Sequence, residues 1–529
     1  PNFHEVFVVS GRHPRRHVRG GGAFTGMAAI VVLGVVAGCS LHQEGVRPPD
    51  NRIFFPGGAI IESAGPGLGK WLYVVNSNSD LRYNAGTVVA VDLAKVRADY
   101  QDGQGSQASL RAWNPCPPDS RWVPPADVAP ADRCCWDTLD PTILNCDEQL
   151  YVRPESSVRI GNFGGRPVMQ QLPPAAKDQS ARRRLFVPVR GDASIGMLEV
   201  ATTAEAATFR CTGDRTDPAD TDGRFPVCEP QWQIKRGDEA AHLPDSDIAR
   251  LPDEPYALAV DDVLQLLYVG HLRGGSVSLI NLGTYDESRT PELLQSVPNL
   301  FPGDANGSQG VTSLTIKKKG CFGPVYVTSR YVPLVGIFVV AGLDNCQAPR
   351  VSGPESARGV AIVGTGQFLN TGLNGTETRG IEFVSTVPGQ DDRAFILQRS
   401  PPALVAVNTV TQLPFATIEV CQSPTNLAQQ TDAAGNTVAL FVTCFDAGEV
   451  YVIDPWVPRV RAVIPVGRGP VATVLPPANA AAEDLTRAYV VGFGANNISV
   501  VDLDPQSPKQ YRIIQRIGFS SPTPREVGR

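Results

Sequence analysis

Three arginines follow the same sequence pattern. Arg190, Arg330 and Arg399 each come directly after a tetrapeptide of the form aromatic-aliphatic-x-x. A guanidinium group binds carboxylates and phosphates bidentately. Three such groups around one opening would therefore hold an anionic ligand. The alternative is that these arginines cap exposed turns and pair with the many aspartates.

Three further residues extend this candidate site. His271 ends one of the tetrapeptides, while Phe445 and Phe493 take the arginine position after two others. We expect the six residues to form a ligand rim that is part cationic and part aromatic. Such a rim would suit a small molecule, a protein or a glycan. For His271 the alternative is a hydrogen-bonded histidine in a turn.

An acidic stretch at residues 211–228, CTGDRTDPADTDGRFPVC, offers different chemistry. Asp217, Asp220 and Asp222 precede Gly223, and alternating carboxylates of this kind converge on calcium in Asp-rich loops. Here the spacing is irregular and the acidic residue expected at the twelfth position is missing. A solvated turn fits better, so we expect no metal and no cofactor, with calcium as the alternative.

Other signatures of chemistry are missing from the sequence. It contains no G-x-S-x-G, phosphate-binding loop or H-E-x-x-H. It also lacks Cys-x-x-Cys, so zinc ribbons and c-type haem have no support. The net charge of −6 comes without a basic stripe, which argues against nucleic acid as a partner.

A leader precedes the first cysteine. Arg15, Arg16 and Arg19 stand before an apolar run shorter than the roughly 20 residues that span a bilayer. Residues 36–39, VAGC, resemble the lipobox of bacterial lipoproteins. The resemblance implies a signal peptide over 1–38, a diacylglycerol on Cys39, a tether over 39–50 and membrane lipid as a partner. By resemblance to Gram-negative lipoproteins, Ser40 favours the outer membrane. A non-cleaved apolar helix is the alternative to this reading of the leader.

Repeats predict the elements that position these residues. The tetrapeptide occurs seven times, at residues 73–76, 186–189, 268–271, 326–329, 395–398, 441–444 and 489–492. A turn and a second alternating strand follow, as in GTVVAVDL at 86–93 and NISVVDLD at 497–504. We predict an all-β, seven-bladed β-propeller of four-stranded antiparallel blades.

The clearest units resemble a known repeat. Residues 464–502 read IPVGRGPVATVLPPANAAAEDLTRAYVVGFGANNISVVD, which is similar to the YVTN family of β-propellers. The resemblance is strongest over residues 254–524 and places the propeller at 51–524, with 525–529 as a tail. We expect the last two strands to share a blade with residues 52–61, so that both ends close the ring.

Ten cysteines other than Cys39 form an even set, which in an exported chain predicts disulfides. Strand adjacency pairs Cys421 with Cys444 and Cys321 with Cys346, and Cys211 and Cys228 bracket one loop. The remaining four, Cys116, Cys134, Cys135 and Cys146, lie in an insertion over 100–155 between units one and two. We expect two bonds there, with adjacent Cys134 and Cys135 bonded to Cys116 and Cys146 in either order. The tryptophans of the insertion form either a docking surface or its small core; they are Trp113, Trp122 and Trp136.

Together these features predict a membrane-anchored lipoprotein whose propeller is a non-enzymatic binding or scaffold module at the cell envelope, with envelope proteins or glycans as partners. The YVTN resemblance implies an alternative, a lactonase or cyclase like the 6-phosphogluconolactonase and carboxymuconate-cyclising enzymes. His271 and the three arginines would then be the residues to test. A subunit of a periplasmic redox complex is the third possibility.

Overall fold

Seven β-sheets make up the part of the chain that the structure, a computed structural model, describes. The described residues all belong to the unit Gly45–Arg529. They are 46–104, 115–116, 133–171, 183–203, 205–210, 233–234, 251–282, 291–298, 300–301, 310–318, 320, 322–342, 360–385 and 391–518.

Each sheet is one blade, and its strands follow one another outward in chain order. Blade 1 contains β1 (Pro56–Ile61), β2 (Trp71–Asn76), β3 (Gly86–Asp92) and β6 (Val152–Ile160). Blade 2 contains β7 (Val168–Gln171), β8 (Arg183–Val189), β9 (Ser194–Thr202) and β10 (Ala207–Arg210), and the short β11 (Gln233–Ile234) also pairs with β9. Blade 3 contains β12 (Pro255–Asp261), β13 (Leu266–His271), β14 (Val277–Asn281) and β15 (Glu292–Val297).

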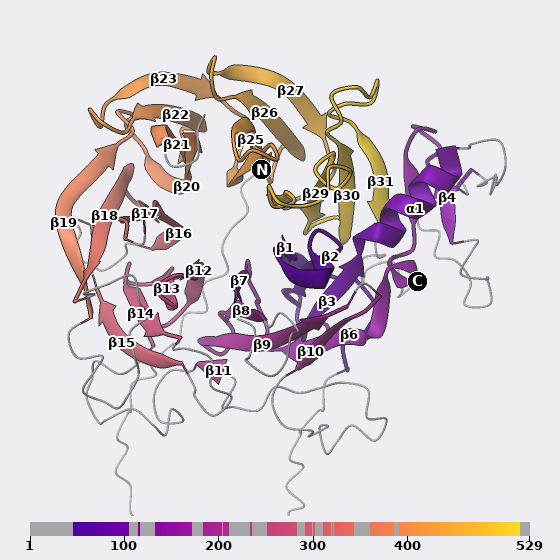
Figure 1. Cartoon of the computed structure of the whole chain (residues 1–529), viewed down its shortest axis with the longest axis horizontal. Coiled ribbons are helices and arrows are strands. Elements are labelled where there is room, and N and C mark those ends of the chain that lie inside the picture. Colours follow the sequence, from indigo (N-terminus) through magenta and orange to yellow (C-terminus); the bar gives the residue numbers. More distant parts are fainter. Residues whose placement is uncertain are drawn as a thin grey trace, which may run out of the picture. The chain divides into compact units, whose positions relative to one another are not determined.

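The remaining blades repeat this order. Blade 4 contains β16 (Val311–Ile316), β17 (Val325–Ser329), β18 (Leu334–Ala341) and β19 (Ala361–Asn370). Blade 5 contains β20 (Thr376–Ser385), β21 (Asp391–Ser400), β22 (Ala403–Asn408) and β23 (Pro414–Glu419). Blade 6 contains β24 (Pro424–Thr431), β25 (Thr437–Cys444), β26 (Glu449–Asp454) and β27 (Arg459–Pro465). Blade 7 contains β28 (Pro470–Val474), β29 (Arg487–Gly492), β30 (Asn497–Asp502) and β31 (Ile513–Ile517). The predicted seven-bladed β-propeller is confirmed (Figure 1).

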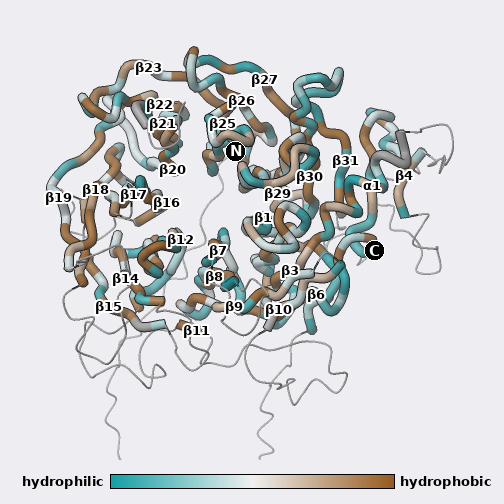
Figure 2. Tube along the Cα trace, in the orientation of Figure 1, coloured by the Kyte–Doolittle hydropathy of each residue, from teal (hydrophilic) through white to brown (hydrophobic). Residues whose placement is uncertain are grey.

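All seven tetrapeptides lie on the second strand of a blade, from Tyr73 in β2 to Tyr489 in β29. These strands are almost fully buried because blades cover both of their faces. Figure 2 shows the hydrophobic residues, in brown, concentrated along the strands. The aromatic and aliphatic residues of the motif are therefore core residues.

Among the described residues the hydrophobic core forms seven clusters, and each cluster joins two neighbouring blades. Blade 5 packs on blade 6 through Phe395 and Leu427, for example, and blade 6 on blade 7 through Phe441 and Val490. The other clusters join the blades in the same way, 1 to 2, 2 to 3, 3 to 4, 4 to 5 and 7 to 1. The ring is thus closed by packing all the way round.

The predicted closure of the ring is wrong in one respect. Residues 52–61 do not join the last blade, because β1 forms an antiparallel hairpin with the nearby β2. The outer edge of β31 is instead occupied by β5 (Leu144–Cys146), which pairs with it in parallel and continues into β4 (Cys134–Trp136). Strand β1 packs against blade 7, and Phe55, just before it, donates its amide to Asn496 Oδ1 at 2.6 Å.

The cysteine-rich insertion that supplies β4 and β5 leaves blade 1 after β3 and ends at β6, the outer strand of the same blade. It starts with the helix α1 (Leu93–Gln104) and includes the short 3-10 helix η3 (Glu148–Leu150); η1 (Gly65–Gly67) lies earlier, between β1 and β2. Trp136 packs against the core between blades 1 and 7.

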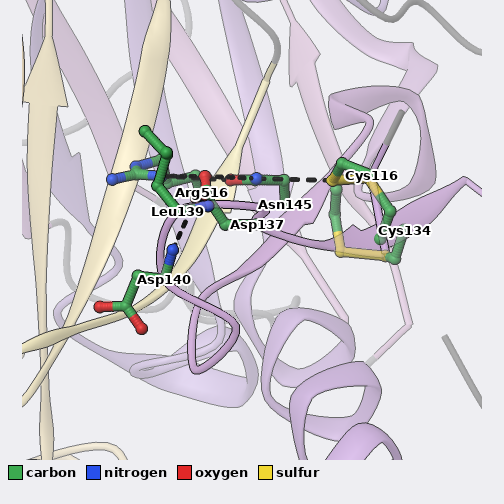
Figure 3. Close-up of a disulfide and its surroundings, with 9 residues drawn as sticks. Cys116, Cys134, Asp137, Leu139, Asp140, Asn145 and Arg516 are labelled. Atoms are coloured by element: carbon green, nitrogen blue, oxygen red, sulfur yellow. Dashed lines mark hydrogen bonds and ion pairs between the residues drawn. A yellow bond between two sulfur atoms is a disulfide. The ribbon is translucent and has the colours of Figure 1, made fainter. Parts of the chain in front are cut away.

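Three disulfides are present among the described residues. Cys116 bonds Cys135, and Cys134 bonds Cys146, so of the two orders left open the chain has this one. Cys421 bonds Cys444, the pair that strand adjacency indicates. Figure 3 shows the environment of the insertion: Asp137 accepts from Arg516 Nη1 of β31 at 2.9 Å and from Asn145 Nδ2 at 3.0 Å.

Several predictions fall outside the described residues. They are the leader 1–38, Cys39 and its tether up to residue 45, Trp113, Trp122, the tail 525–529, the bonds Cys211–Cys228 and Cys321–Cys346, and the calcium candidates Asp217, Asp220 and Asp222. Among the residues that are described, no helix is long and apolar enough to cross a membrane. The same residues contain no cluster of three or more His, Cys, Asp or Glu that could hold a metal.

Candidate functional site

Six of the seven inner strands begin with the same irregularity. Near its start each strand skips one residue in its pairing with the second strand. A bulge of this kind frees a residue from the ladder and redirects its side chain. The skipped residues are Gly57, Tyr256, Thr312, Arg379, Thr425 and Val471, and all six line one channel.

A left-handed residue precedes most of these bulges by two positions. Glu254 has a φ of 52° ahead of Tyr256, and Glu377 has a φ of 68° ahead of Arg379. Phe55, Ser423 and Gly469 have the same conformation in blades 1, 6 and 7. A non-glycine residue is strained at such angles. The same strained turn therefore precedes most inner strands. It places the residue two positions later in the lining of the channel.

The channel runs through the centre of the propeller, because residues of all seven inner strands line it. Its volume is about 820 Å³, within the range of small-molecule sites. In blade 2, where β7 has no such bulge in its pairing, the segment ahead of that strand supplies Arg166 and the neighbouring Pro167.

Two arginines contact one tyrosine in this channel, and a third lies within electrostatic range of it. Arg379 Nη1 donates to the Tyr256 hydroxyl at 3.4 Å. The Arg190 guanidinium carbon lies 5.8 Å from the centroid of the same ring, a cation–π distance. Arg166 also interacts with Tyr256 electrostatically. Blades 2, 3 and 5 thus bring their polar groups to one place.

Glu382, on the same strand as Arg379, is the acidic partner in the channel. Burial raises the pKa of Glu382 to about 7, and the nearby positive charge of Arg166 opposes that rise. Burial also lowers the pKa of Arg166, although an arginine stays charged at neutral pH. Arg166 is exposed and Glu382 is half-buried, so water in the channel reaches both side chains. Glu382 can therefore hold or release a proton near neutral pH.

Arg399 joins this group through Glu377. The Glu377 carboxylate forms an ion pair with Arg379 and accepts from Arg399 Nη1 at 3.4 Å. The structure thus brings one predicted rim arginine next to an arginine of the channel. Arg379 Nε itself is buried and has no hydrogen-bond partner among the described residues.

The predicted rim is only partly assembled. Arg190 and Phe493 line the channel. Phe493 is the centre of an aromatic cluster, with ring centroids 6.2 Å from Phe445 and 5.5 Å from Phe55. Arg330 is elsewhere, with its guanidinium carbon 5.5 Å from the ring centroid of its neighbour Tyr331, and it is not among the residues lining the channel.

His271 is not a rim residue, because its side chain is completely buried inside blade 3. Its Nδ1 lies 3.1 Å from the Asp253 carbonyl oxygen and its Nε2 lies 2.9 Å from Ser278 Oγ. Burial lowers the pKa of His271 to about 4, so the ring is neutral at physiological pH. Both ring nitrogens are used by the protein, and His271 is a structural residue of the strand end.

The sequence reasoning missed Arg166, Tyr256, Arg379 and Glu382. A proline directly precedes four of the bulge residues, Gly57, Tyr256, Thr425 and Val471, and in blade 7 it is the proline of the I-x-V-G-x-x-P motif. The residue after this proline is the one that faces the channel. In blade 5 Thr378 takes the place of the proline, so this sequence signal does not identify Arg379.

Comparison with known proteins yields only distant structures. No family model matches the chain, and no curated protein matches it. A protein from Lactobacillus plantarum is 13% identical with a TM-score of 0.43, covering 69% of this chain and 89% of that one. Candidate 6-phosphogluconolactonases from Bacteroides fragilis and Bacteroides uniformis are each 10% identical, with TM-scores of 0.41 and 0.42. They cover 66% and 79% of this chain and 97% and 87% of their own. Scores at this level carry no argument about function, so the fold rests on the strand pairing itself.

Proposed function

We propose that this chain is an exported lipoprotein of the cell envelope, anchored through Cys39, whose propeller is a non-enzymatic binding module. The observation that carries the proposal is the central channel, where side chains from separate blades meet at Tyr256. Arginines bind and orient ligands but do not exchange protons at neutral pH. The lipobox-like VAGC and the disulfides support export.

The test of the anchor is fractionation of cells that express the full chain or its Cys39→Ala variant. We expect the wild type in the membrane fraction and the variant as a soluble envelope protein, because the variant has no thiol to accept lipid. Cys421→Ala is the matched control, since it removes a cysteine without touching the leader. A Cys39→Ala variant that stays membrane-bound would refute the anchor.

The partner can be sought with the same material. Gentle detergent extraction of the lipidated protein, followed by mass spectrometry, would identify whatever co-purifies. A stoichiometric protein would make this chain an assembly component. A lone monomer would point to a small ligand in the channel.

Glu382 favours one enzymatic alternative. A carboxyl group that exchanges a proton near neutral pH beside arginines is the arrangement that a lactonase-like hydrolase would need, with Glu382 as the acid or base and Arg166 and Arg379 polarising the substrate. Turnover of a panel of lactones that is lost in Glu382→Gln, with folding intact, would establish this activity. Equal turnover in the variant would exclude Glu382 from it.

A further inference from the structure

The charge of the channel differs from the charge of the chain. The whole sequence carries a net charge of −6. Among the described residues that line the channel, the charged side chains are Arg166, Arg190, Arg379 and Glu382. Three cations and one titratable carboxyl therefore line the channel of an acidic protein, and one of the three, Arg379, is also paired with Glu377. A cavity of this sign concentrates anions.

Two of the three guanidinium groups contact a single aromatic ring, and the third lies within electrostatic range of it. Arg379 contacts the Tyr256 hydroxyl, and Arg190 lies near the face of the ring. Arg166 interacts electrostatically with Glu382 and Tyr256. The main chains of the three arginines come from three separate places: the segment before β7, the end of β8 and the bulge of β20. Arg379 Nε remains a buried donor without an acceptor among the described residues.

The opposite wall contains no competing charge in the described part of the channel. Thr425, Gln429 and Val471, from blades 6 and 7, line it. An anion would therefore be drawn to the arginine side, and the neutral wall would contact the rest of the molecule. The volume of about 820 Å³ accommodates a small organic molecule rather than a folded partner.

We propose that the central channel binds a small organic anion through its carboxylate or phosphate group, held by Arg166, Arg190 and Arg379 around Tyr256. The inference rests on the proposed binding role and names the ligand class for it. Guanidinium groups suit both acidic groups because each can donate two parallel hydrogen bonds to paired oxygens.

Glu382 gives this site a dependence on pH. Arg166, from the segment before β7, is the charge that acts on it. Arg379, three residues earlier on the same strand and paired with Glu377, and Arg190 are the other charged side chains that line the channel. When Glu382 is ionised it repels an anion, and when it is protonated it does not. Because its pKa is about 7, binding should strengthen as the pH falls through neutrality.

The experiment is isothermal titration calorimetry on the full chain in detergent. Malate serves as the carboxylate probe at about pH 6.5 and about pH 8, and inorganic phosphate serves as the phosphate probe at about pH 8. We expect at least one probe to bind, and to bind at least tenfold more weakly to Arg166→Gln and Arg379→Gln. Arg330→Gln is the matched control, because Arg330 lies outside the channel lining, and it should bind like the wild type.

Two further variants sharpen the result. Arg379→Lys keeps the charge but loses the bidentate fork, so an intermediate affinity is expected. Glu382→Gln should bind malate at about pH 8 as tightly as the wild type does at about pH 6.5, with the pH dependence lost. The probe that binds tells whether the acidic group is a carboxylate or a phosphate.

Two outcomes would overturn the proposal. One is that neither probe binds to a correctly folded wild type. The other is that binding is the same in Arg166→Gln, Arg379→Gln and the Arg330→Gln control, which would place the anion elsewhere. The binding role itself is tested separately, because a protein partner can co-purify whether or not an anion occupies the channel.

Discussion

At the scale of single residues, the most deeply buried charges lie between blades 1 and 2. Arg183 Nε of β8 is 2.8 Å from Glu62 Oε1, and both side chains are 0% exposed. Glu62, directly after β1, also accepts from the Tyr73 hydroxyl at 2.8 Å. Burial raises the pKa of Glu62, while the positive charge of Arg183 counteracts this. The pair is therefore costly to bury but more costly to break.

Removing one partner should show this cost. We expect Arg183→Met to lower the free energy of unfolding by about 3–5 kcal/mol, because Glu62 is left without its counter-charge. The pKa of Glu62 is already raised on folding, so the loss should be smaller at about pH 5, where Glu62 can be protonated, than at about pH 8. Urea unfolding at the two pH values measures both effects.

Two variants serve as controls for this pair. Arg82→Met breaks the pair with Asp80, whose side chains are 32% and 26% exposed, and should cost no more than about 1 kcal/mol. Adding Glu62→Gln to Arg183→Met removes the buried charge while keeping an acceptor for Tyr73, and should recover part of the stability. A pH-independent loss in Arg183→Met would contradict the assignment to Glu62.

At the scale of elements, the insertion acts as a clasp between the first and last blades. Strand β5 continues blade 7, while the chain on either side of the insertion belongs to blade 1. The Gly518 amide donates to the Cys146 carbonyl oxygen at 2.9 Å, next to the Cys134–Cys146 bond. This short parallel strand covers an edge that would otherwise be open at the end of the chain's last blade.

The Cys134–Cys146 bond should hold this clasp in place. We expect the double variant Cys134→Ala with Cys146→Ala to lose about 2–4 kcal/mol of stability, because the bond closes a short loop that supports β5. Hydrogen exchange in β31 should accelerate at the same time. The double variant Cys421→Ala with Cys444→Ala is the control, since that bond does not touch β31 and its loss should not accelerate exchange in β31 more than in the other blades. Equal exchange of β31 in the wild type and the first variant would show that the clasp does not need the disulfide.

The sequence predicts the elements better than it predicts their distant contacts. Each tetrapeptide is local and repeats with its turn, so the second strands and their neighbours can be assigned from the residues alone. The pairing of Leu144 with Gln515 cannot be assigned from the residues alone, because the two are far apart in the chain and β5 does not contain the repeated motif. The sequence does not predict the channel residues either, for a related reason. Arg166 lies in a connecting segment, and Arg379 lies at a bulge that breaks the strand alternation.

At the scale of the whole molecule, no blade has a core of its own. Each of the seven clusters draws residues from two blades, so loss of packing in one cluster weakens the blades on both sides. Energy in repeat architectures is carried by such nearest-neighbour contacts. In a closed ring no blade has an uncovered face, so no blade can unfold first at a low cost in free energy.

This arrangement predicts that the propeller unfolds in one step. Phe395 of β21 is 0% exposed in the cluster between blades 5 and 6. We expect Phe395→Ala to lower the free energy of unfolding by about 3–5 kcal/mol. The variant should still show a single calorimetric transition, and hydrogen exchange should accelerate in distant blade 2 as well as in blade 5. Phe415→Ala, on the outer strand of the same blade and 48% exposed, should change stability by only about 0.5 kcal/mol. Two separate transitions in Phe395→Ala, one unchanged from the wild type, would mean that the blades unfold independently and that ring closure contributes little to stability.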